Sequence, residues 1–188
     1  MVDHRKREKI PISDGVYVLL LMKRGKDNDG VKSEHDYPTI YRHIVRDYDK
    51  DVEHLKTIAK SRKGVWRIYR SVNKRSFAKA NTLFKHRLID DYGEYYYRLD
   101  SLWKTCLLKK ESRAEKKFLI DIDNKKDYEK VLKEITKHKI KILEEPKETV
   151  NGYHIITTPF DKRIMDKFKS VEIGTDHYVF VSIIGDKK

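Results

Sequence analysis

The stretch KKFLIDIDNKKDYEKVLKEITKHK, residues 116–139, decides the fold of the C-terminal half of this chain. Its first eight residues contain an apolar run that predicts a buried strand. Its last thirteen residues repeat apolar side chains at the spacing of one helix face, namely Tyr128, Val131, Leu132 and Ile135. A strand joined by a short turn to an amphipathic helix therefore opens this half of the protein.

Further elements follow this strand and helix along the chain. Apolar runs predict strands at 139–143, 153–157, 171–173 and 178–184, and helical spacing predicts a helix at 161–169. The order β-α-β-β-α-β-β indicates an α/β (α+β) fold with one mixed sheet and helices on one face, close to an RRM- or ferredoxin-like core. We assign this core to residues 113–188.

The N-terminal part, residues 12–112, is predicted to add an α/β layer to that core. Its expected elements are a strand at 16–22, a helix at 48–61, a half-buried strand at 65–72 and a helix capped by Ser76. In the aromatic stretch 91–110 the apolar residues follow neither a helical nor a strand period, so we predict no secondary structure there. Residues 1–11 form a basic arm, and residues 25–36 form a polar loop.

Composition favours an intracellular protein with an anionic partner. The 188 residues carry 43 Lys and Arg against 30 Asp and Glu, a formal charge of +13, which favours nucleic acid or an anionic membrane surface. No apolar stretch approaches the roughly 18 residues of a spanning helix, and no apolar signal-peptide core follows the N-terminus. Cys106 is the single cysteine, which excludes an internal disulfide and a Cys-based zinc cluster. We therefore expect a cytoplasmic location, in a host cytoplasm if the protein is viral.

Asp121 and Asp123 are the strongest candidates for chemistry. The period of two along a strand puts both on one face, with Cα atoms about 7 Å apart. Hard cations such as Mg²⁺ or Mn²⁺ prefer such carboxylate oxygens. Asp-x-Asp pairs also occur in polar stretches of this chain, but only this one interrupts an apolar strand. The alternative is a strand-end pair that Lys side chains or backbone N–H groups satisfy.

His154 and Glu172 are the next candidates. The Asn151-Gly152 turn delivers His154 to the start of a strand, where it could contact a phosphate or be a satisfied core residue. Glu172 lies between two apolar residues and could supply a third carboxylate on a neighbouring strand. Asp176 and His177 are competitors, although they follow Gly174 as turn residues do.

Together these motifs resemble the catalytic core of the archaeo-eukaryotic primase superfamily, which includes small primase-polymerases of viruses and plasmids. The resemblance covers residues 113–184 and rests on FLIDID, on TVNGYH and on the VE of 171–172. It implies that Asp121, Asp123 and Glu172 hold two metal ions and that His154 contacts the phosphates of an incoming nucleoside triphosphate. It also implies that the nucleotide pocket is shaped by Thr149, Asn151 and Gly152.

The segment GVWRIYRSVNKRSF, residues 64–77, is the candidate surface for nucleic acid. It interleaves basic with aromatic side chains, which suits phosphate contacts combined with base stacking, and the residues we assign to it are Arg67, Tyr69, Arg70, Lys74 and Arg75. The alternative is that the aromatic side chains are core and the basic side chains are solvated.

Three functional classes follow from these features. The first is a metal-dependent nucleotidyltransferase of the primase-polymerase type, which uses Mg²⁺ or Mn²⁺ and nucleoside triphosphates and extends DNA or RNA. The second is a metal-dependent nuclease or other phosphoesterase that uses the same carboxylates. The third is a catalytically inactive nucleic-acid-binding protein, for example a phage factor that acts on host machinery.

Overall fold

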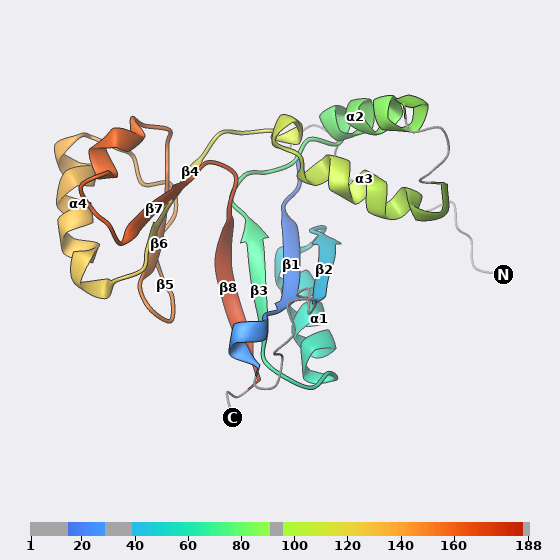
Figure 1. The fold of residues 1–188 in the computed structure, drawn as a ribbon, viewed down its shortest axis with the longest axis horizontal. Helices are drawn as coiled ribbons and strands as arrows, with labels where there is room; N and C mark the ends of the chain where they lie inside the picture. The colour runs from blue at the N-terminus through green and yellow to red at the C-terminus, as the bar shows by residue number, and fades with distance from the viewer. Residues whose placement is uncertain (1–14, 29–38, 91–95, 186–188) are drawn as a thin grey trace.

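The computed structural model describes residues 15–28, 39–90 and 96–185. They form two antiparallel four-stranded sheets and four α-helices (Figure 1), which confirms the predicted α+β class. The predicted basic arm at 1–11 and residues 29–36 of the predicted loop lie outside the described residues. Within these ranges, no helix is long and apolar enough to cross a lipid bilayer.

The first sheet has the strand order β2-β1-β3-β8. Its strands are β1 (Val18–Lys23), β2 (Thr39–Ile44), β3 (Trp66–Ser71) and β8 (Tyr178–Ile184). Helix α1 (Tyr48–Lys60) packs on the face that carries Leu19 and Leu21. The opposite face, with Val18 and Leu20, packs against α2 (Phe77–Asp90) and α3 (Leu99–Leu108). The unassigned aromatic stretch thus contributes a helix to this layer.

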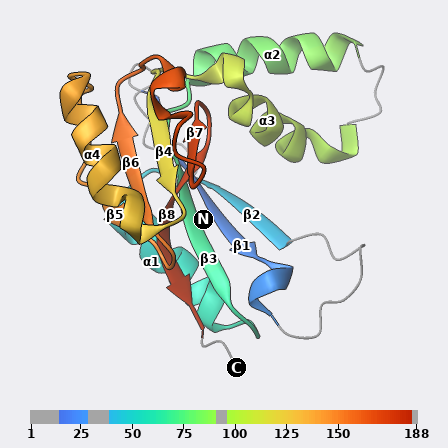
Figure 2. The ribbon, with the colours of Figure 1, turned by 60° about the vertical axis from the view of Figure 1, so that its left-hand side comes forward.

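The second sheet has the strand order β5-β6-β4-β7. Its strands are β4 (Phe118–Ile122), β5 (Lys147–Glu148), β6 (Tyr153–Thr157) and β7 (Val171–Gly174). Helix α4 (Tyr128–Lys137) and the 3₁₀ helix η5 (Lys162–Met165) cover one face, where Ile120, Ile122 and Ile155 are fully buried. This order and single covered face agree with the expected ferredoxin-like arrangement. Figure 2 shows α4 on the side of this sheet turned away from β8 and β3.

Two predicted elements in this unit are wrong. Residues 139–143 form no regular strand, because Lys139 has a φ of 51° and the Ile140 amide bonds to the Ile135 carbonyl to end α4. The segment then contacts the sheet only through an isolated bridge between Ile142 and Thr157, made by the Leu143 N–H and the Lys141 carbonyl. The predicted helix at 161–169 is reduced to η5, whose bonds span three residues.

The expectation of one sheet is also wrong for residues 178–184. This strand, β8, pairs with β3 in the first sheet and not with the strands that precede it. The edge of the second sheet beside β4 is already occupied by β7. The turn after Gly174 therefore carries the chain from one sheet to the other, and the apolar alternation of β8 completes the sheet that β1 begins.

The loop after β3 joins the two sheets through buried polar groups. The Asn73 amide donates to the carbonyls of Lys117 (3.3 Å) and Thr175 (3.2 Å) and accepts from the Lys117 N–H (2.6 Å). Arg75 is fully buried and pairs with Asp176, at 2.9 Å between Nη2 and Oδ1. Its guanidinium also donates to the carbonyls that end α3. The predicted role of Arg75 in nucleic-acid binding is therefore wrong in this structure, because no part of its side chain reaches the surface.

Replacing Arg75 by Met should lower the free energy of unfolding by about 3 to 5 kcal/mol, because Asp176 and two carbonyls would lose a buried cation. Urea denaturation measures this loss. The matched control is Lys85→Met on the exposed side of α2, which should stay within about 0.5 kcal/mol of the wild type. Equal stability of the two variants would show that the buried pair does not hold the fold together.

Candidate active site

A row of polar side chains crosses the face of the second sheet opposite α4. Asp121 on β4 is paired in register with His154 on β6 and with Glu172 on β7. Directly paired residues of antiparallel strands point to the same face of the sheet. That face also carries Leu119 and Ile156, which pack against the first sheet. The polar row thus lies on the side of the sheet that faces β3 and β8.

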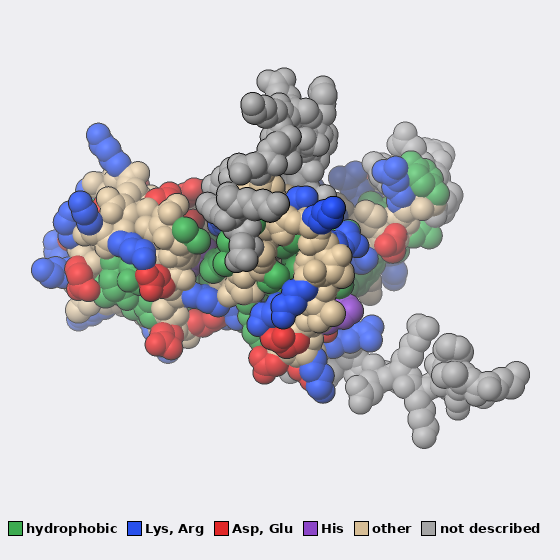
Figure 3. Space-filling view, turned by 90° about the horizontal axis from the view of Figure 1, so that it is seen from below, with side chains coloured by type: hydrophobic (Ala, Val, Ile, Leu, Met, Phe, Trp, Pro, Cys, Tyr) green, Lys and Arg blue, Asp and Glu red, His purple; other side chains and the backbone are tan. Residues whose placement is uncertain are grey.

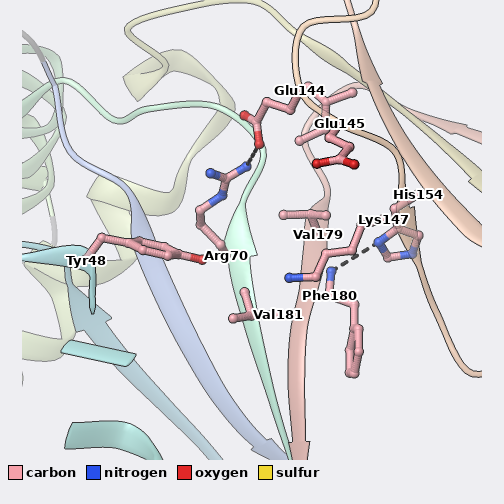
Figure 4. Close-up of a pocket in the computed structure, with 10 residues that line it drawn as sticks. Tyr48, Arg70, Glu144, Glu145, Lys147, His154, Val179, Phe180 and Val181 are labelled. Carbon is pink, nitrogen blue, oxygen red and sulfur yellow. Dashed lines mark hydrogen bonds and ion pairs between the residues drawn. The ribbon is translucent and has the colours of Figure 1, made fainter. Parts of the chain in front are cut away.

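His154 connects the two sheets. Its side chain is 8% exposed, and its Nδ1 accepts a hydrogen bond from the Phe180 N–H of β8 at 3.1 Å (Figure 4). Because Nδ1 acts as an acceptor, the proton of the neutral ring is on Nε2. That atom lies 3.2 Å from Asp121 Oδ1. The ring is therefore held by a hydrogen bond at Nδ1 and lies beside a carboxylate at Nε2.

The three acids assigned to metal binding keep carboxylate oxygens open to solvent. The side chains of Asp121 and Glu172 are 34% and 71% exposed, and Asp123 is exposed just after β4 ends. Among the described residues, no Lys or Arg forms an ion pair with any of them. Their donor type suits Mg²⁺ or Mn²⁺, although no three His, Cys, Asp or Glu side chains in the described ranges converge on one point.

The competitors of Glu172 have distinct surroundings. Asp176 is held by Arg75, which gives it a structural role. His177 lies against Gly174, where any β-carbon would collide with the imidazole. Its Nε2 is 3.9 Å from Glu172 Oε1, so His177 extends the polar row by one residue.

The turn before His154 is built by two of the residues assigned to the nucleotide pocket. The Thr149 N–H donates to the Gly152 carbonyl (2.9 Å), and the Gly152 N–H donates to Thr149 Oγ1 (3.1 Å). A side chain at Gly152 would collide with the backbone of Ile122 at the end of β4. Asn151 is exposed at the tip. These contacts fix the register that sets His154 beside Asp121.

A small pocket of about 90 Å³ opens beside His154, between the two sheets (Figure 4). Its polar lining comes from α1, β3, the segment before β6 and β6 itself: Tyr48, Arg70, Glu144, Glu145, Lys147 and His154. The apolar lining comes from β6 and β8. Sequence reasoning missed Tyr48, Glu144, Glu145 and Lys147, because Tyr48 is far in sequence from the stretch that holds the other three and only the packing of the two sheets brings them together.

The charges around this pocket are partly shielded from water. Arg70 Nη2 is 2.5 Å from Glu144 Oε2, and its guanidinium lies 4.6 Å from the centre of the Tyr17 ring. Burial lowers the pKa of Lys147 and the charge of Arg70 lowers it further, while Glu144 opposes this shift. Burial likewise raises the pKa of Tyr48, and Arg70 offsets part of that rise. An anion bound between Arg70 and Lys147 would relieve the repulsion between them.

The basic segment of β3 does not form one surface. Arg67 is paired with Asp27 (2.6 Å), and Tyr69 accepts from Arg24 (3.2 Å) on the face opposite Arg70. Lys74 stays near the Tyr17 ring, with Nζ 5.8 Å from its centre. Figure 3 shows Lys and Arg side chains spread between acidic ones over the face that it displays. Of the five residues assigned to nucleic acid, Arg70 and Lys74 both lie against the Tyr17 ring, and Arg70 also lines the pocket.

In comparisons with protein-family models, curated proteins and solved structures, nothing matched this chain. The functional argument therefore rests on the residues and geometry described above.

Replacing His154 by Ala should lower the free energy of unfolding by about 1 to 2 kcal/mol, because the Phe180 N–H would lose its acceptor. Denaturation with guanidinium chloride measures the change. Glu172→Ala serves as the control on the same sheet face and should stay within about 0.5 kcal/mol of the wild type. An unchanged midpoint for the His154 variant would show that the imidazole does not link the sheets.

Proposed function

We propose that this protein is a metal-dependent nucleotidyltransferase of the small primase-polymerase type, which adds nucleotides to a nucleic-acid strand. The observation that carries the proposal is the register of Asp121 between His154 and Glu172, on the sheet face that borders a pocket lined in part by Arg70 and Lys147. A carboxylate row beside such a pocket combines sites for a metal ion and for a polyphosphate.

The proposed reaction is an in-line attack of a strand's 3′-hydroxyl on the α-phosphate of a nucleoside triphosphate, with release of pyrophosphate. Mg²⁺ or Mn²⁺ held by Asp121, Asp123 and Glu172 would supply Lewis acidity for the hydroxyl and the leaving group. His154 Nε2, which lies 3.2 Å from Asp121 Oδ1 in the free protein, would donate to a phosphate oxygen of the nucleotide. The apolar wall from β6 and β8 would limit access of water to the phosphates.

The exposed carboxylates argue against a protein that binds nucleic acid without catalysis. Acids repel phosphates unless a cation lies between them, and these three have no Lys or Arg partner in the described part of the chain. A metal-dependent nuclease would use the same carboxylates. The pocket favours transfer, since Arg70 and Lys147 offer two cations to the phosphates of a nucleotide.

A labelled primer-template incubated with Mn²⁺ and nucleotides tests the proposal, and we expect the primer to lengthen. Replacing both Asp121 and Asp123 by Ala should reduce extension by at least about a hundredfold, because the metal ligands would be lost. The matched control is Glu129→Ala with Asp166→Ala, which removes two exposed carboxylates from the helix-covered side of the same sheet. Its extension should equal that of the wild type.

Other results of this assay would contradict the proposal in distinct ways. Shortening of the primer would indicate a nuclease, and strand binding without either reaction would indicate a binding protein. Full activity of the Asp121 and Asp123 variant would remove these carboxylates from catalysis. Loss of several kcal/mol of stability in that variant would instead mean that the pair is structural.

A further inference from the structure

An ion pair between Arg70 and Glu144 lines one side of the pocket and connects the two sheets. Glu144, in the segment before β5, reaches Arg70 on β3 at 2.5 Å. The two side chains are 34% and 13% exposed, so solvent only partly screens the contact. Figure 4 shows the carboxylate of Glu144 meeting the guanidinium at the edge of the pocket. The neighbouring Glu145 also lines the pocket, and no ion pair is formed by it within the described ranges.

Lys147 is the second cation of the pocket, and among the described residues no carboxylate forms an ion pair with it. It lies near enough to Arg70 for the two charges to repel each other. It also belongs to β5, where it is paired in register with His154. The pocket therefore contains a partly buried cation that forms no ion pair within the described part of the chain.

We propose that Arg70 and Lys147 form a phosphate-binding subsite and that Glu144 occupies it in the free protein as an internal anion. A phosphate group displaces the Glu144 carboxylate from Arg70 and bridges Arg70 and Lys147. The identity of the phosphate as the tail of a nucleoside triphosphate rests on the proposed function, whereas the exchange itself does not.

The chemistry of Arg70 supports this exchange. A guanidinium offers parallel N–H donors that fit a carboxylate and a phosphate in the same way. A triphosphate carries more charge than one carboxylate and can contact both cations, so it competes favourably with Glu144. The Tyr17 ring under the guanidinium would keep Arg70 in place when Glu144 leaves. Glu144 thus lowers the apparent affinity of the subsite without being needed to shape it.

Titration calorimetry of the full chain with inorganic tripolyphosphate, without metal, tests the exchange. Glu144→Gln should bind tripolyphosphate roughly tenfold more tightly than the wild type, because Arg70 no longer has an internal competitor. Glu145→Gln is the matched control, since it removes the same charge from the same pocket and leaves the Arg70 pair intact. Its affinity should rise by less than about threefold.

A second pair of variants tests the contribution of Lys147. Lys147→Gln should weaken tripolyphosphate binding roughly tenfold, because one of the two cations of the subsite is lost. Lys141→Gln, at an exposed site of the preceding segment, should change it by less than about twofold. Thermal unfolding of all four variants verifies that they are folded.

Two further ligands distinguish the source of the phosphate. A nucleoside triphosphate should show the same pattern among the variants as tripolyphosphate, whereas a single-stranded oligonucleotide without a terminal phosphate should not. The reverse pattern would assign the subsite to the strand backbone and overturn the triphosphate assignment.

Equal effects of Glu144→Gln and Glu145→Gln, or no effect of Lys147→Gln, would overturn the subsite. This outcome differs from failure of the proposed function, because tripolyphosphate binding requires neither metal nor catalysis. If the protein shows the predicted exchange but does not extend a primer, the subsite proposal stands and the proposed nucleotidyltransferase function is wrong.

Discussion

Asn73 and Arg75 bring polar groups into a region from which the two sheets exclude water, and the relative arrangement of the sheets depends on them. Each hydrogen bond that Asn73 makes fixes the entry to β4 or the turn before β8. Arg75 connects the same loop to the end of α3 by hydrogen bonds and to Asp176 by an ion pair. Because a buried unpaired polar group is strongly unfavourable, few alternative arrangements satisfy all of these partners. The gap between the sheets, and hence the pocket, is defined by this loop.

His154 couples the candidate site to the relative arrangement of the two sheets. Its imidazole has one partner in each sheet, so a change in the angle between the sheets would disturb the hydrogen bond from Phe180 or the contact with Asp121. Asp123 and Glu172 differ from it, since their carboxylates are exposed to solvent. The site therefore combines a rigid donor with adjustable anionic groups, an arrangement suited to ligands that bring their own cation.

Local pattern was enough to predict the elements that bury an apolar stripe. The strand at 118–122 and the helices of 48–60 and 128–137 have clear periods and formed as expected. The spacing around Gly152 predicted the turn before His154. The partner of β8 could not be predicted, because its apolar alternation fits the edge of either sheet. The pocket could not be predicted from the sequence either, because Arg70 and Glu144 are far apart in sequence and meet only where the two sheets pack together.

The return of β8 to the first sheet has a consequence for synthesis of the chain on the ribosome. During translation, β1, β2 and β3 emerge well before β8, so β3 presents an open edge while the whole ferredoxin-like unit is still being made. Open edges of this kind pair readily with other chains. Contacts between residues so distant in sequence also form slowly. The nascent protein therefore passes through a stage in which its first sheet is incomplete and exposed to association with a chaperone or a neighbouring chain.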